Sequence, residues 1–115
     1  MNLNIEYSKA LDFGHLDDIN AARDKLSELT TLLNKVIVIR QKCKIDIIIC
    51  CASYPEAKLH KLSWDNKLVS LSSKHRELVE LWQEADTAYR QIKNKQDQVM
   101  EDLLSLKKMI DVTPR

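Results

Sequence analysis

The chain has 115 residues, of which 44% are hydrophobic and 30% are charged, and its formal net charge is +1. This mix is typical of a folded chain and disfavours intrinsic disorder, and the length suits one domain. The near-neutral charge disfavours a free-standing nucleic-acid binder, which carries a basic excess, and an acidic mimic of DNA.

Glycine is nearly absent, since Gly14 is the single one, and proline occurs twice. A β-rich domain needs many tight turns, and these need glycine, asparagine or proline. The composition therefore predicts an all-α fold with few turns and long helices.

Residues 1–15 form a mixed lead-in segment. Leu3, Ile5 and Tyr7 alternate with polar residues, which indicates an extended stretch. The residues from Ser8 to Phe13 can form one helical turn, and Gly14 is suited to end it.

A first long helix is expected over residues 16–52. Its apolar residues recur at alternating spacings of three and four, the pattern of a helical stripe that faces a partner helix. Arg40 interrupts the stripe, whose members are Ile19, Ala22, Leu26, Leu29, Leu33, Val36, Cys43, Ile47 and Cys50.

Residues 36–51 are rich in β-branched side chains, so a β-hairpin turning at residues 41–44 is the alternative for this stretch. That turn has no glycine, asparagine or aspartate, and the helical register continues through it, which favours a helix. As a helix, the stretch is apolar beyond its stripe and needs more than one neighbour to cover it. The surplus residues are Ile37, Val38, Ile39, Ile45, Ile48 and Ile49.

A second long helix is expected over residues 55–111. Ser53 and Glu56 have the spacing of a capping box, and Pro55 is tolerated in a first helical turn. The second stripe consists of Leu68, Leu71, His75, Leu78, Trp82, Ala85, Tyr89, Ile92, Val99, Leu103, Leu106 and Ile110, with Gln96 as an interruption.

The short connection predicts a coiled-coil-like antiparallel helical hairpin, in which facing residue numbers sum to about 107. Leu29 would then face Leu78, and Ala22 would face Ala85. The second helix outruns the first and leaves an uncovered apolar stretch, which either residues 1–15 or another chain must cover. We therefore expect a bundle completed by dimerisation or by a bound partner. The uncovered residues are Ile92, Val99, Leu103, Leu106 and Ile110.

The sequence contains no recognisable catalytic, cofactor or metal motif. Cys43, Cys50 and Cys51 resemble buried free thiols rather than a disulfide framework or a zinc site. His75, on the second stripe, is expected to be a packed and hydrogen-bonded core residue, with a pH-sensitive contact as the alternative. We expect no enzyme activity and no cofactor.

Arg40 and Gln96 are polar residues on apolar stripes. Such residues can fix the register or the oligomeric state of paired helices. The alternative for Arg40 is that its methylenes lie on the core while its charge reaches the solvent.

Two surfaces are candidates for binding a partner. One combines Trp64, the aromatic residue best placed for an interface, with the uncovered residues of the second helix. The other is a basic tip near the predicted turn, made by Arg40, Lys42, Lys44, Lys58, Lys61 and Lys67.

We therefore expect a protein–protein interaction module, as an adaptor, an assembly subunit or an inhibitor of a larger complex, acting as a homodimer or in a hetero-complex. The alternative is a nucleic-acid-associated accessory protein that contacts phosphates through the basic tip. No apolar stretch resembles a signal peptide or a membrane span, so we expect a cytoplasmic location and no membrane contact.

Overall fold

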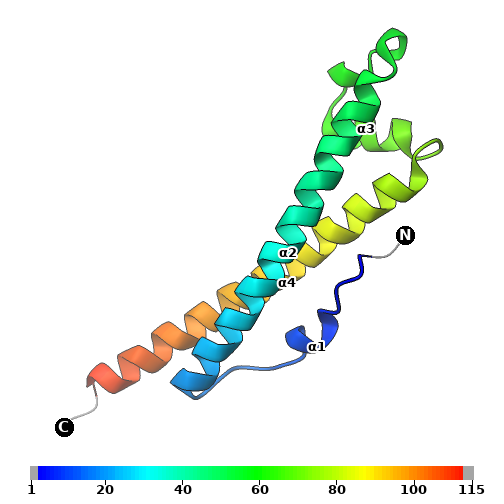
Figure 1. Cartoon of the computed structure of the whole chain (residues 1–115). Helices are drawn as coiled ribbons and strands as arrows, with labels where there is room; N and C mark the ends of the chain where they lie inside the picture. The colour runs from blue at the N-terminus through cyan, green and yellow to red at the C-terminus, as the bar shows by residue number, and fades with distance from the viewer. Residues whose placement is uncertain (1–2, 113–115) are drawn as a thin grey trace. The chain divides into compact units, whose positions relative to one another are not determined.

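The computed structural model describes residues 3–112, and it describes side chains as far as residue 110. Of the described residues, 81% are helical and none lies in a strand, so the predicted all-α fold is confirmed. Two long helices, α2 (Ile19–Ala52) and α4 (Arg76–Val112), pack against each other as a helical hairpin (Figure 1). Because α2 continues through residues 36–51, the β-hairpin alternative is wrong.

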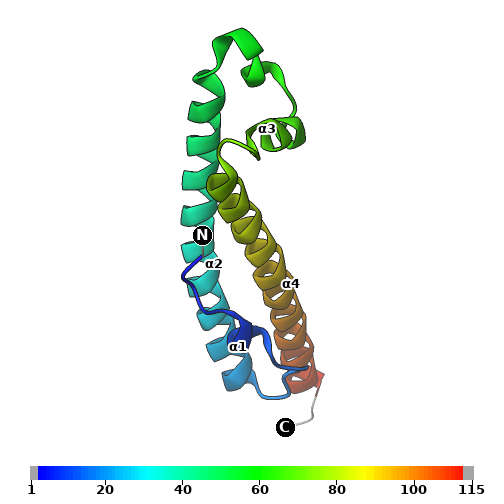
Figure 2. The ribbon, with the colours of Figure 1, turned by 90° about the vertical axis from the view of Figure 1, so that its right-hand side faces the viewer.

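The connection between the two long helices is far longer than predicted, and the single helix expected over residues 55–111 is wrong. After α2 the chain forms two 3₁₀ turns, Pro55–Ala57 and Leu59–Lys61, and then a short helix, α3 (Trp64–Leu71). Figure 2 shows these elements leading from the end of α2 to the start of α4.

The local chemistry explains the longer connection. The Ser53 hydroxyl donates to the Ile49 carbonyl at 3.1 Å, and Tyr54, with no side-chain cap, precedes the first 3₁₀ turn, so the predicted capping box does not form. Lys58 then adopts a left-handed conformation, with φ of 53°, which a continuous helix does not allow. The side-chain cap forms later, where Ser63 accepts a hydrogen bond from the Asn66 N–H at 3.4 Å.

The longer connection shifts the pairing of the two helices. Arg40 Nε lies 3.1 Å from Asp86 Oδ1, and Gln96 Nε2 donates to Thr30 Oγ1 at 3.0 Å. The residue numbers of both pairs sum to 126 rather than the predicted 107. The predicted facing pairs, such as Leu29 with Leu78, are therefore wrong, because residues 53–75 do not continue the second helix.

The chain divides into two compact units, and each is described by itself. Unit 1 contains residues 3–4 and 36–87, and unit 2 contains residues 5–35 and 88–112. Each unit includes one part of α2 and one part of α4.

The core of unit 1 joins the end of α2 to α3 and to the start of α4. Trp64 and Trp82 pack at its margin with their ring centroids 5.1 Å apart in an edge arrangement. The buried members of this core are Ile47, Cys51, Leu68, Leu71 and Val79.

Unit 2 contains the start of α2, the rest of α4 and the N-terminal residues. The predicted helical turn is confirmed as α1 (Ser8–Leu11), although it ends at Asp12 rather than at Gly14. The buried apolar residues of unit 2 are Ala10, Ala22, Leu29, Leu33, Ala88, Ile92 and Val99.

The burial of α4 in unit 2 corrects one prediction. Ile92 and Val99 are fully buried, so the prediction of an uncovered apolar stretch is wrong for these two residues. The corrected register brings them to the level of the first half of α2, and the N-terminal residues also reach this part of α4. These two side chains are therefore covered by their own chain and do not need another one.

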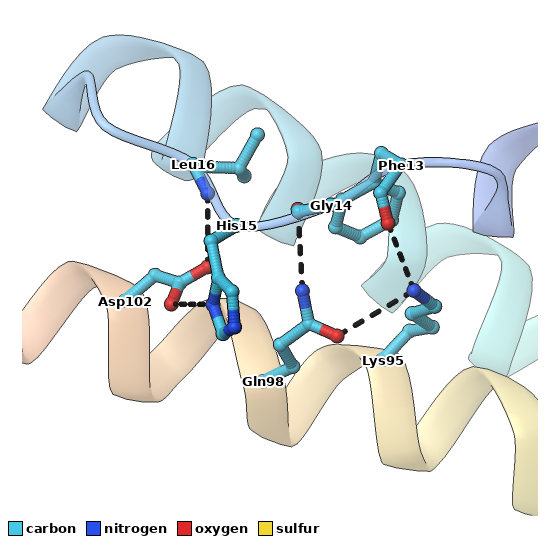
Figure 3. A network of polar contacts seen from close by, with 7 residues as sticks. All are labelled: Phe13, Gly14, His15, Leu16, Lys95, Gln98 and Asp102. Atoms are coloured by element: carbon cyan, nitrogen blue, oxygen red, sulfur yellow. Dashed lines mark hydrogen bonds and ion pairs between the residues drawn. The ribbon is translucent and has the colours of Figure 1, made fainter.

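The N-terminal cover is a strap, residues 13–16, held on α4 by polar contacts (Figure 3). Lys95 Nζ donates to the Phe13 carbonyl at 2.9 Å, and the Gln98 amide donates to the Gly14 carbonyl at 3.2 Å. Asp102 accepts the Leu16 N–H at 3.0 Å and lies 2.9 Å from His15 Nδ1. The exposed backbone of the strap is thus paired with side chains from successive turns of α4.

The contacts of Asp102 also change its acidity. The hydrogen bond from His15, followed by that from the Leu16 N–H, holds the pKa of the Asp102 carboxyl below its ordinary value, because both favour the charged form. A carboxyl whose pKa is lower in the folded state stabilises the fold above its unfolded-state pKa.

The core of unit 1 gives a first prediction. Replacing Ile47 by alanine should lower the free energy of unfolding by about 2–5 kcal/mol, because the side chain is fully buried and leaves a cavity. Urea denaturation followed by circular dichroism measures the loss. Ile49→Ala, on the same helix but 58% exposed, is the matched control and should change stability far less. Equal losses in the two variants would contradict the assigned core.

The strap gives a second prediction. Asp102→Asn should speed the hydrogen exchange of the Leu16 amide, since that amide loses a charged acceptor. The extra protection of the Leu16 amide in the wild type, relative to the variant, should be complete above the ordinary carboxyl pKa of about 4. It should disappear as the pH falls through the lowered folded-state pKa of Asp102. Extra protection that persists unchanged in acid would show that the Asp102 charge does not hold the strap.

Candidate functional site

The second half of α2 carries an apolar surface that the described chain leaves exposed. We call this surface the outer face. Each side chain is β-branched, and each exposes a large part of its area. The outer face consists of Ile37 (41% exposed), Val38 (67%), Ile45 (48%), Ile48 (48%) and Ile49 (58%).

The outer face lies on the side of α2 opposite the core of unit 1. Successive residues of an α-helix are rotated by about 100°, which places Ile45 and Val38 nearly opposite Ile47 and Cys43. Ile47 is fully buried and Cys43 is 3% exposed. This half of α2 is therefore apolar on two opposite sides, and the described residues of its own chain cover one of them.

Polar residues border the outer face on one flank. Lys42 and Asp46 are one helical turn apart. Around the helix axis, they lie next to Val38 and Ile49 on the side away from Ile37 and Ile48. Together with Ile37, Val38, Gln41 and Ile45, they line a shallow hollow of about 410 Å³. Among the described residues, no ion pair joins Lys42 or Asp46 to a side chain of the same chain.

Three of the six residues of the predicted basic tip interact with groups of their own chain. Arg40 is paired with Asp86, and Lys67 Nζ donates to the carbonyl oxygens of His60, at 3.2 Å, and Leu62. Lys44 Nζ lies over the Trp64 ring, 5.8 Å from its centroid. The other three, Lys42, Lys58 and Lys61, are exposed.

The buried partner of Arg40 was missed in the sequence. Asp86 is 8% exposed, and it was not among the residues singled out from the sequence. The signal that could have found it was Arg40 itself, since a cation on an apolar stripe is favoured when a facing carboxylate neutralises it.

Trp64 is directed inward rather than away from the molecule. Its ring packs against Trp82, and the indole N–H groups of both are buried without a hydrogen-bond partner in the described chain. Each unpaired N–H costs roughly 1–3 kcal/mol. Most of the Trp64 side chain therefore serves internal packing in unit 1.

The C-terminal candidates differ in exposure. Leu103 and Leu106 are half-buried in unit 2, in contrast to the fully buried Ile92 and Val99. Ile110 is 52% exposed. The nearby Met100, Leu104 and Met109 are exposed to similar extents. The end of α4 thus retains some exposed apolar area, although its side chains alternate with charged ones.

His75 has hydrogen-bond partners in unit 1, as expected for a packed histidine. Its Nε2 lies 3.0 Å from the Tyr54 hydroxyl, and its Nδ1 lies 4.0 Å from the Cys50 sulfur. Burial raises the pKa of the Cys43 and Cys51 thiols, because desolvation disfavours a thiolate. The three cysteines are free, as the sequence indicated.

A metal-ligand cluster and a membrane-spanning helix are both absent from the part of the chain that the structure describes. No three or more histidine, cysteine, aspartate or glutamate side chains gather there in a way that could hold a metal ion. No described helix is both long enough and apolar enough to cross a bilayer.

Comparison with family models, with curated proteins and with solved structures finds no match to this chain. The functional argument therefore depends on the outer face and its surroundings.

The contacts of Lys67 give a third prediction. Lys67→Met should destabilise the connection before α3 by roughly 0.5–1.5 kcal/mol, since two loop carbonyls lose their donor. Amide exchange across residues 59–66 measures the local effect. Lys61→Met removes an exposed lysine from the same connection and should leave exchange unchanged; the same response in both variants would refute the assigned role of Lys67.

Proposed function

We propose that this chain is a non-enzymatic protein–protein interaction module that binds its partner through the outer face of α2. Adaptors, assembly subunits and inhibitors of larger complexes all act in this way. The observation that supports the proposal is the contiguous set of exposed isoleucine and valine side chains opposite the core. Exposed apolar patches of this kind are typical of interaction sites.

The chemistry of the outer face suits binding. β-Branched side chains on a helix already occupy a restricted set of rotamers, so burying them costs little further conformational entropy. Each side chain that leaves water contributes through the hydrophobic effect, at about 25 cal/mol per Å² of apolar area. The helix also holds the side chains in a fixed arrangement, since its other side is anchored in the core of unit 1.

The alternative, a nucleic-acid-associated accessory protein, has less support. Arg40, Lys44 and Lys67 each interact with groups of their own chain. Phosphate binding depends on several cations acting together, and these internal contacts compete with it. A cytoplasmic location stays a prediction from the sequence.

The proposal is tested by a charged substitution in the outer face. Ile45→Glu should abolish capture of the partner by the tagged chain from its native cells, because a buried carboxylate without a counter-charge is strongly disfavoured in an interface. Quantitative mass spectrometry of the captured material, which includes untagged copies of the chain itself, provides the measurement.

The matched control is Ser70→Glu, an exposed site on α3 in the same unit. It should retain capture, and both variants should unfold at the wild-type urea concentration. Capture that Ile45→Glu leaves intact would overturn the proposal. Equal loss of capture in the control would count against the proposal as well. So would capture of nucleic acid whose binding is lost at moderate salt.

A further inference from the structure

We infer that the outer face of α2 binds the same face of a second copy of this chain, with the two helices antiparallel. The inference depends on the proposed function, since it names the partner of that face. It is carried by the charges of Lys42 and Asp46 at the border of the outer face, which both find opposite charges in the antiparallel orientation and only partly in the parallel one.

The first step concerns the flank that carries Lys42 and Asp46. In a symmetric antiparallel pair, each flank of one helix faces the same flank of the other, and the direction along the helix is reversed. With the two-fold axis level with residue 44, each Lys42 reaches the level of the partner's Asp46. The symmetric pair of helices thus provides two ion pairs between Lys42 and Asp46. Neither Lys42 nor Asp46 has an ion-pair partner among the described residues of its own chain.

The second step compares the parallel orientation, which pairs these charges less well. In a parallel pair, each flank faces the opposite flank of the other helix, as in a parallel coiled coil. The partner's Lys44 would then lie level with the midpoint between Lys42 and Asp46, so its attraction to Asp46 would be offset by its repulsion from Lys42. In the antiparallel pair Lys44 stays on the far flank, where its Nζ lies over the Trp64 ring of its own chain.

The third step concerns the apolar seam. About the same axis, Val38 reaches the level of the partner's residue 50, next to Ile49, and Ile45 reaches the level of residue 43, between the partner's Gln41 and Ile45. Large apolar side chains therefore meet along most of the seam, and the one polar residue within it, Gln41, lies near its centre. A self-complementary surface of this kind matches the requirement of a two-fold interface.

Cysteine cross-linking tests the orientation. The test uses chains in which the native cysteines are replaced by alanine or serine and one cysteine is introduced at an exposed seam position, Val38→Cys or Ile48→Cys. A mixture of the two chains should form a disulfide-linked dimer under mild oxidation, whereas each chain alone should not, because an antiparallel pair holds identical positions far apart. Efficient cross-linking of each chain alone would show a parallel pair and would overturn the inference.

Charge exchange tests the ion pairs. The wild-type chain should sediment at micromolar concentration with twice the 13.4 kDa mass of one chain. Lys42→Glu and Asp46→Lys should each weaken the dimer by at least about tenfold in dissociation constant, and the double variant should recover most of the loss. The pairing would be contradicted if the double variant lost as much dimerisation free energy as the two single variants lose together.

The two proposals fail in different ways. A wild-type chain that stays monomeric at micromolar concentration, yet captures a different protein that Ile45→Glu loses, would overturn the second copy as the partner and leave the proposed function standing. A chain that dimerises equally well with Ile45→Glu would overturn both. A matched pair of exchanges on α4, Lys108→Glu and Glu101→Lys, should leave the dimer unchanged if the outer face is the interface.

Discussion

The structure depends on one constraint, which is that the second half of α2 is apolar on two opposite sides. In the described part of the chain, α3 and the start of α4 cover it on the side of Ile47 and Cys51. The side that carries Ile45 and Ile48 stays exposed. Exposing β-branched side chains to water brings a folded monomer no gain, so their arrangement is best explained by a second surface that covers them.

Polar contacts determine which part of the chain is left to bind. The pairs Arg40–Asp86 and Gln96–Thr30 set one register between α2 and α4, because a slip would separate the buried Asp86 carboxylate from the Arg40 guanidinium. In that register Ile92 and Val99 lie level with the first half of α2, and both are fully buried. The surface available for a partner therefore moves from the C-terminal helix, where the sequence placed it, to the outer face of α2.

The sequence predicted the regular parts of the fold and failed at the connection. The spacing of the apolar residues was sufficient for the course of α2 and for the surplus of Ile37, Ile45 and Ile48, since both follow from helical periodicity. The break between α3 and α4 was missed because no glycine or proline marks it and the apolar spacing continues from Leu71 to Leu78. The left-handed conformation of Lys58 has no signal in its residue type. One wrong connection then displaced every facing pair, because register is a property of the whole hairpin. The contacts of the strap and of Asp86 depend on that register, so the sequence could not predict them.

The central claim is that the outer face is covered when the protein is assembled. Methyl NMR with a soluble paramagnetic agent tests it most directly, because the agent broadens the signals of methyl groups that it can reach. In the assembled protein, the methyl signals of Ile45, Ile48 and Ile49 should be protected, whereas those of Leu104 and Met109, exposed on α4, should broaden strongly. Equal broadening of both groups would show that the outer face remains open to water and would contradict the account.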